Sequence, residues 1–349
     1  MRLNPNLGKN LALAPLAIAS IFCGACTDQP TSNQLERWRT EAIALNAEKV
    51  KANTQEAQKT EWNLAIGGQI AQGEPVQLNW QQLQALATNR VKTTDPNSVL
   101  NPEEIFDFRG IPVSTLLKQL AIAPDVRDVT FVCFDGYQVT IAVKDLLAYP
   151  ITLAIARNGK PIPRAQGGPI YLIFPYTQYP ELKKKYNELS WAFYVSHMII
   201  GTEPVRLRVG KRELDLATLD KLPQVTISDN VGYRMGWPTG KVKLHGVRVR
   251  DVLAFAGVQL PVNGEIVIQG KAPIYRDASN PVRLAAADLR DCDILLATRW
   301  GDNQESIPAK MGGPLTLAFG SKCQDREEKS FSLSKQRWVT FVVEILSNL

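Results

Sequence analysis

The chain has 349 residues, a length that allows two domains. Its composition, 45% hydrophobic and 21% charged, is that of a globular protein with a substantial core. The formal net charge is +6, but aromatic and basic residues do not interleave as they do in nucleic-acid-binding grooves, so we expect no nucleic-acid partner. The densest basic run, Lys183–Lys185, is typical of a solvated loop, with an anion contact as the alternative.

Residues 1–25 are predicted to be a signal peptide. Arg2 and Lys9 precede an uncharged, mostly apolar stretch at 11–25 that is too short to span a membrane. The stretch ends Cys23-Gly24-Ala25-Cys26, and small residues directly before a cysteine resemble a bacterial lipobox, although leucine usually stands where this chain has Cys23. Lipidation at Cys26 would anchor the protein in the bacterial cell envelope, facing the periplasm, and would be its only membrane attachment. Cleavage with release is one alternative, and a Cys-x-x-Cys redox motif is a poorer one, because a signal sequence is no redox scaffold.

A polar tether and helix are predicted at 26–61, where Leu35, Trp38, Ala42 and Leu45 recur at helical spacing. A first domain at 62–201 and a second at 205–349 follow.

The two domains are predicted from an internal repeat. Residues 78–117 align without a gap with residues 214–253, at an offset of 136. Two further landmarks recur after each segment, a Gly-Gly-Pro sequence at 167–169 and 312–314 and a tryptophan at 191 and 338. A repeat of about 140 residues is the size of a domain and far longer than a solenoid unit.

Each copy is predicted to contain the same mixed α and β elements in the same order. The strands, helices and turns expected from periodicity are a strand (64–66; 205–209), a helix (80–87; 217–222), a loop and glycine turn, an amphipathic helix (113–120; 249–256), two strands (129–134 and 138–143; 265–269 and 282–285), a short helix, the Gly-Gly-Pro turn, and two strands (170–174 and 191–199; 315–319 and 338–346). The predicted fold class is α+β. The paired glycines suit a turn that needs positive φ or close backbone approach.

Four segments of the first copy together resemble the molybdopterin-binding domain of the sulfite oxidase family. They are Phe106-Asp107-Phe108-Arg109-Gly110-Ile111-Pro112, Phe134-Asp135-Gly136-Tyr137, the stretch from Leu153 to Ile162, and Gly167-Gly168-Pro169 with the apolar strand up to Pro175. The resemblance covers both copies, is clearer in the first, and implies two tandem sulfite-oxidase-like domains with an oxidoreductase-like ancestry.

The resemblance also implies a molybdenum-binding cysteine about a dozen residues before Gly110 and Gly246, because a thiolate completes the metal site in that family. Neither 93–109 nor 229–245 contains a cysteine; Ser98 and Arg234 stand nearest that position. Cys133 falls on a later predicted strand, and Cys292 and Cys323 could pair, which the sequence does not decide. The lone Arg2 also differs from the twin-arginine signal that exports folded, cofactor-loaded enzymes.

Few other residues indicate a catalytic, metal-binding or ligand-binding site. Two histidines, His197 and His245, are too far apart in sequence to indicate a metal site, and no phosphate-binding loop is present. Asp135 is typical of a turn, although an acid role is possible. If a pocket persists in the first domain, we expect it to be lined by Arg109, Asp135, Tyr137, Arg164 and Lys185, as cofactor- or ligand-binding residues whose cations suit a small anionic ligand.

Three functions remain open at this point. The leading one is an exported, lipid-anchored module that binds a small anionic ligand or an envelope protein partner and carries no cofactor and no metal. The alternative is a molybdopterin-dependent oxidoreductase that binds its cofactor in the first domain, and the third is a structural protein with empty pockets. The sequence identifies no catalytic residue, ligand, redox partner or oligomeric state.

Overall fold

The computed structural model describes residues 40, 62–71, 73–98, 100–231, 236–260, 264–271, 281–320 and 339–347. Residues 50–349 form one compact unit. The predicted signal peptide, Cys26 and the tether apart from Thr40 lie outside the described residues, as do Arg234, Cys323 and Trp338. Within the described ranges, no helix has the length and apolar character needed to cross a membrane.

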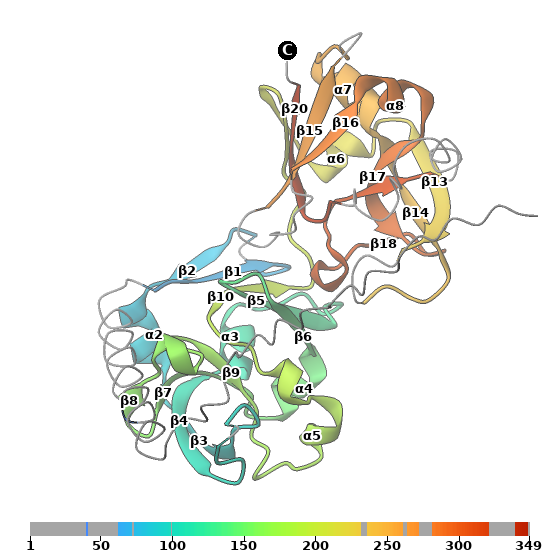
Figure 1. Cartoon of the computed structure of the whole chain (residues 1–349). Helices are drawn as coiled ribbons and strands as arrows, with labels where there is room; N and C mark the ends of the chain where they lie inside the picture. Colours follow the sequence, from blue (N-terminus) through green and yellow to red (C-terminus); the bar gives the residue numbers. More distant parts are fainter. Residues whose placement is uncertain are drawn as a thin grey trace, which may run out of the picture. The chain divides into compact units, whose positions relative to one another are not determined.

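The first group of elements lies between residues 64 and 200, coloured blue to green in Figure 1. Its elements are β1 (Leu64–Gly68), β2 (Val76–Leu78), α2 (Trp80–Leu86), β3 (Asn89–Thr94), β4 (Ile105–Pro112), α3 (Val113–Gln119), β5 (Asp128–Cys133), β6 (Gln138–Ala142), α4 (Val143–Ala148), β7 (Thr152–Arg157), β8 (Lys160–Pro161), η1 (Arg164–Gln166), β9 (Tyr171–Ile173), α5 (Leu182–Lys185), η2 (Glu188–Ser190) and β10 (Val195–Ile200).

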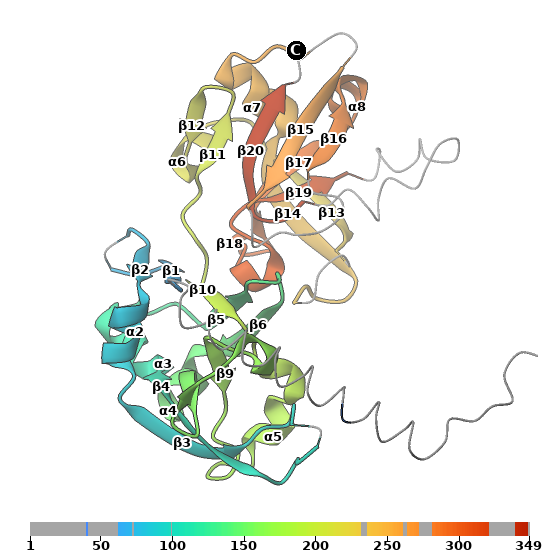
Figure 2. The same cartoon turned by 60° about the vertical axis from the view of Figure 1, so that its left-hand side comes forward.

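The second group lies between residues 207 and 347, coloured yellow to red, and its elements stay together in both views (Figures 1 and 2). Its elements are β11 (Leu207–Val209), β12 (Arg212–Leu214), α6 (Leu216–Leu219), β13 (Gln224–Asn230), β14 (Lys241–Arg248), α7 (Val249–Ala256), β15 (Glu265–Gly270), β16 (Val282–Ala285), α8 (Ala286–Asp291), β17 (Ile294–Trp300), β18 (Glu305–Ser306), η3 (Ala309–Met311), β19 (Thr316–Phe319) and β20 (Val342–Ser347).

The two groups have the same sheet topology. In the first, one sheet has the order β2-β1-β10-β5-β6 and another the order β3-β4-β7-β8, with β9 also paired to β7. In the second, the orders are β12-β11-β20-β15-β16 and β13-β14-β17-β18, with β19 paired to β17. Parallel pairs (β1 with β10, β11 with β20) occur beside antiparallel ones, so the sheets are mixed. The α+β fold class predicted from the sequence is confirmed.

The backbone around one strained residue is also the same in both groups. Tyr194 and Phe341 both have positive φ, 56° and 51°, which is uncommon for aromatic residues. The Tyr194 N–H donates to Gly167 O at 3.0 Å, and the Phe341 N–H donates to Gly312 O at 2.7 Å. The unusual conformation is therefore held by the Gly-Gly-Pro turn in each case.

The Gly-Gly-Pro turns meet both conditions expected from the sequence. Gly167 and Gly312 have φ of 92° and 95°, which favours glycine. A Cβ on Gly168 would lie 1.8 Å from Ile162 O, and one on Gly313 would lie 1.7 Å from Ile307 O. Positive φ and close backbone approach thus fall on successive glycines.

The predicted loop and glycine turn before the amphipathic helix are wrong. The hairpin β3–β4 occupies this region in the first group and β13–β14 in the second, and β7 and β17 were missed as well. Gly110 and Gly246 lie inside strands β4 and β14, at register shifts against β7 and β17. A Cβ on Gly110 would lie 2.2 Å from Leu153 O, so close packing of two strands, and no turn, requires this glycine.

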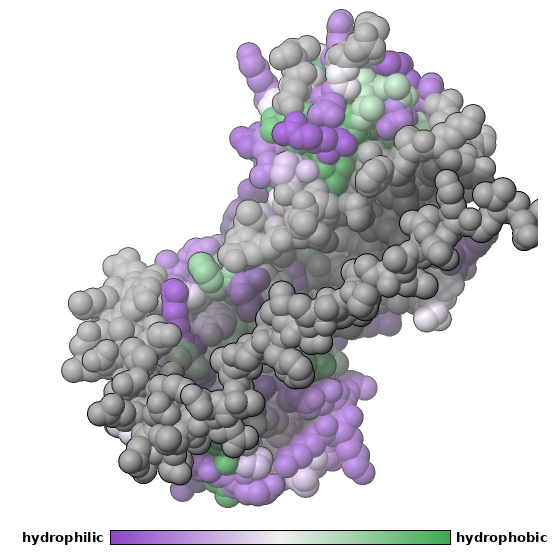
Figure 3. All heavy atoms as spheres, viewed as in Figure 1, coloured by the Kyte–Doolittle hydropathy of each residue, from purple (hydrophilic) through white to green (hydrophobic). Residues whose placement is uncertain are grey.

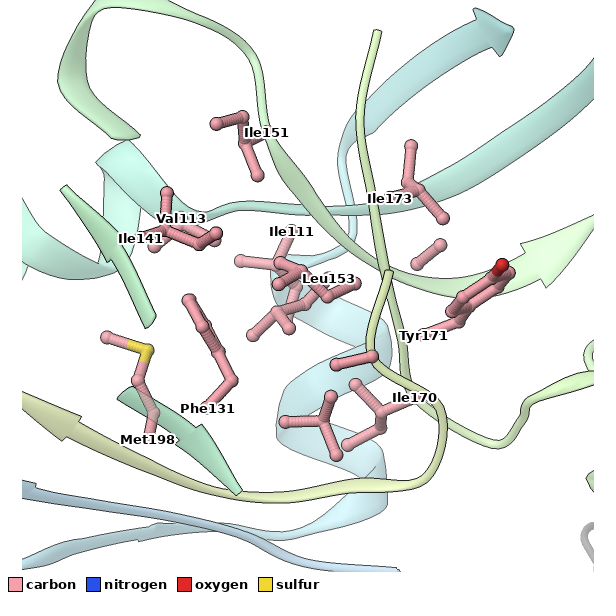
Figure 4. Close-up of a cluster of buried hydrophobic side chains, with 14 of the residues drawn as sticks. Ile111, Val113, Phe131, Ile141, Ile151, Leu153, Ile170, Tyr171, Ile173 and Met198 are labelled. Carbon is pink, nitrogen blue, oxygen red and sulfur yellow. The ribbon is translucent and has the colours of Figure 1, made fainter. Parts of the chain in front are cut away.

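The core of the first group lies between its sheets and helices α3 and α4. Ile111, Phe131, Leu153 and Ile170 are fully buried and converge in the cluster drawn in Figure 4. Trp191, one of the landmarks of the sequence repeat, is 1% exposed and belongs to this core. On the face drawn in Figure 3, the described surface is predominantly hydrophilic.

Candidate functional site

The Asp-Gly-Tyr segment is the tight turn between β5 and β6. The Asp135 carboxylate accepts a hydrogen bond from the Tyr137 N–H at 3.0 Å, and Gly136 has a φ of 87°. Backbone hydrogen bonds join Cys133 to Gly136 and Tyr137 at 2.9 and 2.8 Å. Asp135 therefore serves as a turn residue, the more conservative of its two interpretations, and its exposed side chain stands at the surface.

Arg164 lies beside this turn. It begins η1, directly before the Gly-Gly-Pro turn, and its guanidinium carbon lies 5.3 Å from the ring centre of Trp62 and 5.6 Å from that of Phe134. Both charged side chains act on the pKa of the Tyr194 phenol. Burial and the Asp135 carboxylate raise this pKa, and the Arg164 guanidinium lowers it. Asp135 and Arg164, which are distant in sequence, are thus brought together near Tyr194.

Tyr137 joins the same turn to η2. Its hydroxyl donates to the Leu189 carbonyl oxygen, and its pKa is raised by burial and by the neighbouring Cys133 and Asp135. Phe134 is 48% exposed and Leu189 is 64% exposed. The Asp-Gly-Tyr turn therefore presents an aromatic, partly exposed surface with one carboxylate and one guanidinium.

Lys185 and Arg109 make their contacts elsewhere. Lys185 pairs with Asp145 on α4, which also accepts from the Tyr186 hydroxyl. Burial opposes ionisation of Asp145, but the hydrogen bonds from Lys185 and Tyr186 prevail and lower the pKa of its carboxyl group. Arg109 donates to the Ala87 carbonyl oxygen at the end of α2, at 3.3 Å. Of the five residues predicted to line one pocket, Asp135, Tyr137 and Arg164 lie close to one another, whereas Arg109 and Lys185 make their contacts elsewhere.

The structure adds a buried polar network that the sequence did not predict. Asp95, at the end of β3, is 3% exposed. Its Oδ1 accepts from the Tyr171 hydroxyl at 3.0 Å and from the Asn97 N–H at 2.9 Å, and its Oδ2 lies 3.5 Å from Arg157 Nη1. Arg157 also donates to Gln166 and lies over the Phe106 ring, 4.7 Å from its centre. Burial, followed by the Asp95 charge, raises the pKa of Tyr171.

The second group has apolar or smaller residues at the equivalent positions. Sequence offset and strand register pair Asp95 with Val231, Arg157 with Trp300 and Tyr171 with Thr316. Val231 is 4% exposed, and Trp300 packs edge-on against Trp237 at 5.9 Å. The fold therefore forms without the polar network. This contrast between aligned positions is the signal that could have found Asp95.

The resemblance places a metal-binding thiolate near Ser98. The polar side chains in this segment are those of Asp95, Asn97 and Ser98, which offer oxygen and nitrogen atoms and no sulfur. Ser98 closes a turn that begins at Asp95, with its N–H donating to Asp95 O at 3.0 Å. Cys133 is fully buried on β5, and burial, followed by the Asp135 charge, raises the pKa of its thiol. In the part of the chain that the structure describes, no group of three or more histidine, cysteine or acidic side chains could hold a metal ion.

The two histidines belong to hydrogen-bonded strands. His245 Nδ1 lies 2.9 Å from Thr226 Oγ1, and its Nε2 lies 2.8 Å from Gly301 O. His197 Nδ1 lies 2.9 Å from Ser196 Oγ; burial and then Lys271 lower its pKa. Both imidazoles therefore have hydrogen-bonding partners within the fold.

Residues 51–184 match the model of the oxidoreductase molybdopterin-binding domain family. The match spans β1 to α5 of the first group and includes the Asp-Gly-Tyr and Gly-Gly-Pro turns. Among solved structures, the crystal structure of the sulfane dehydrogenase SoxCD from Paracoccus pantotrophus is similar at 12% identity and a TM-score of 0.31, over 82% of this chain and 77% of that one. No curated protein matches the chain.

The donors in the first group do not fit a molybdenum site completed by a protein thiolate. The required soft ligand is missing between residues 93 and 109, and the nearby Asp95 carboxylate is already engaged by Tyr171, Asn97 and Arg157. Cys133 belongs to a different strand, inside the core.

Proposed function

We propose that this chain is an exported, lipid-anchored protein whose molybdopterin-domain-like first half binds a small anionic ligand or an envelope partner without molybdenum. The observation that carries the proposal is the Asp95 network beside the position that the family's thiolate would occupy. In this network the buried Asp95 carboxylate already uses its oxygens for a hydrogen bond from Tyr171 and an ion pair with Arg157.

The retained binding surface is proposed to be the Asp-Gly-Tyr turn with Arg164. Aromatic side chains supply contact area at low entropic cost, and a guanidinium recognises carboxylates and oxyanions in a bidentate way. Arg164, which is partly buried, lies over the Trp62 and Phe134 rings, and Phe134 directly precedes Asp135 in the sequence. In the second half, the segment aligned with Asp-Gly-Tyr is Ala272–Tyr275, which lies outside the described residues.

We further propose that the chain arose by duplication of one domain, with the boundary at residues 201–205. The repeated strand orders and the matching strained residues Tyr194 and Phe341 support this proposal. Lipidation at Cys26 in a periplasm-facing envelope location remains part of the proposal, on the order of charged, apolar and small residues before that cysteine.

The deciding experiment is metal and pterin analysis of protein purified from its native envelope. We expect far less than one molybdenum per chain and no pterin fluorescence after acid oxidation. Stoichiometric molybdenum would overturn the proposal and favour the alternative, a molybdopterin-dependent oxidoreductase whose first domain binds the cofactor. The family match at residues 51–184 is the observation that favours this alternative.

Anion binding is tested by thermal unfolding with phosphate, sulfate and succinate. A ligand that binds only the folded state raises the melting temperature. Arg164→Gln should reduce the shift, whereas Arg206→Gln, an exposed arginine paired with Glu74, should not. Equal shifts in both variants would contradict a role for Arg164. Membrane attachment is tested separately: Cys26→Ser should release the protein into the soluble fraction, and identical fractionation of wild type and variant would contradict the anchor.

A further inference from the structure

A cavity opens in the second half, at a place distinct from the surface proposed above. Its volume is about 320 Å³, near the lower end of the range for small-molecule sites. The segment before β11, the start of α6, and strands β17 and β18 surround it together with Pro314 of the Gly-Gly-Pro turn. Its most informative lining residues are Glu203, Val205, Asp215, Leu216, Thr298 and Pro314.

Differences between the two halves explain why the cavity exists. Leu64 pairs with Leu78 in the first half and Leu207 pairs with Leu214 in the second. This register makes Val205 equivalent to Trp62 and Leu216 equivalent to Trp80.

Trp62 is 6% exposed and donates its indole N–H to Val195 O at 3.1 Å, and Trp80 is half-buried against the first core. Two indoles in the first half are thus replaced by an isopropyl and an isobutyl group in the second. We attribute the open volume in the second half to these smaller side chains.

The charged side chains around the cavity favour a cationic ligand. Glu203 and Asp215 supply carboxylates, and among the described residues no lysine or arginine lines the cavity. Lys271 donates to both Glu203 oxygens at 2.7 Å and neutralises that carboxylate. Asp215 is fully exposed and caps α6 by accepting from the Thr218 N–H and hydroxyl, an arrangement that lowers the pKa of its carboxyl group. The net charge next to the cavity is therefore negative.

We propose that this cavity binds a small organic amine, with its ammonium group toward Asp215 and its carbon chain against Val205, Leu216 and Pro314. Glu203 would accept a second hydrogen bond where the amine also carries a hydroxyl. A small anion would meet the uncompensated Asp215 carboxylate, so the second half would select a ligand of the opposite charge from the one proposed for the first. This inference does not depend on the proposed function, because none of its residues belongs to the first half.

The test uses the full mature chain and compares three four-carbon probes, butylammonium, butyrate and butanol. We expect butylammonium to raise the melting temperature and to give saturable heat in calorimetry, with butanol weaker and butyrate without effect. Equal binding of butyrate and butylammonium would overturn the proposal.

Two variants introduce residues that the first half has at the equivalent positions. Leu216→Trp introduces the residue found at the equivalent position 80 and should abolish butylammonium binding by filling the cavity. Asp215→Asn introduces the residue found at position 79, where Asn79 caps α2 through the Gln82 N–H at 2.9 Å. It should raise the Kd for butylammonium about two- to fivefold, the range expected for one exposed charge.

Glu213→Gln is the matched control, because it removes one exposed charge two residues away, outside the cavity lining. It should bind butylammonium as wild type does. If Leu216→Trp fails to fold, Asp215→Asn against Glu213→Gln still decides. A Kd unchanged in Asp215→Asn, or a well-folded Leu216→Trp that binds butylammonium normally, would refute the site.

Discussion

Replacing Asp95 by asparagine should destabilise the first half substantially, although the two side chains have nearly the same shape. The amide oxygen of asparagine can still accept from Tyr171 and from the Asn97 N–H, so those hydrogen bonds persist. The charge opposite Arg157 is lost. At 3.5 Å and an effective dielectric constant of about 20, the gross attraction of this pair is about 5 kcal/mol.

The expected net cost of Asp95→Asn is about 2–3 kcal/mol. Removing one partner of a buried ion pair typically costs about 3–5 kcal/mol, because the remaining charge is left without compensation. Two features of Arg157 place the cost below that range. Its side chain is 17% exposed, and it keeps its hydrogen bond to Gln166 and its contact with the Phe106 ring.

The second half supplies the control for this experiment. The combination Asp95→Val, Arg157→Trp and Tyr171→Phe replaces the network by apolar side chains, of which valine and tryptophan are the residues present at 231 and 300. Replacing a whole buried ion pair by well-packed apolar residues is often neutral or stabilising. The triple variant should therefore be more stable than Asp95→Asn, despite carrying more changes.

The assay is hydrogen exchange by mass spectrometry on peptides that cover residues 93–109, with thermal unfolding of the full chain beside it. A loss of about 2–3 kcal/mol corresponds to roughly 30- to 150-fold less protection of those amides if they exchange by unfolding. Exchange in Asp95→Asn within about twofold of wild type would refute the reasoning. A triple variant less stable than Asp95→Asn would refute the claim that the fold does not need the network.

Three further predictions concern the packed glycine, a paired carboxylate and a buried thiol. Gly110→Ala should lower the free energy of unfolding by about 1–3 kcal/mol or more, because its Cβ would meet backbone, and Gly246→Ala should behave alike; unfolding curves in urea check both. The pKa of Asp145 is lowered in the folded state, so its contribution is present above the ordinary carboxyl pKa and is lost as pH falls through the lowered value. The stability gap between wild type and Asp145→Asn should therefore close as pH falls below about 4, and a constant gap would contradict the pairing with Lys185. Cys133 should resist iodoacetamide at pH 8 in the folded protein and react in urea, as mass spectrometry of its peptide would show, because burial raises its thiol pKa; rapid labelling of the native protein would contradict its burial.

The sequence predicted the elements whose patterns are local and apolar. Helix α7 has the predicted bounds, Val249–Ala256, because its apolar positions recur at helical spacing. Strand β3 was missed because only Val91 and Thr93 among its residues are buried, so its sequence resembles a polar loop. Its pairing with β4 depends on tertiary structure, which the hydrophobic periodicity of the sequence does not predict.

The candidate site was predictable only in part for the same physical reason. Asp135 and Tyr137 are neighbours in sequence, and a turn motif can identify them together. The approach of Arg164 to their turn depends on the packing of η1 against Trp62 and Phe134, which joins residues about 30 and 100 positions apart. Asp95 carried no local signal at all, because a single aspartate in a predicted loop is ordinarily solvated.

The duplicated topology allows function and fold to be separated by substitution between equivalent positions. A residue needed for the fold should have a counterpart of the same kind, as Gly110 has in Gly246 and Gly168 has in Gly313. The ion pair of Asp95 and Arg157 has no such counterpart, since the second half has the buried Val231 and the partly buried Trp300 there and still forms the same sheets. Burying charges costs desolvation energy, so a network that the fold can lose without changing its topology has a reason beyond folding. That reason is best sought at the β3–β4 loop, whose base the network fixes and whose residue Leu100 is 93% exposed.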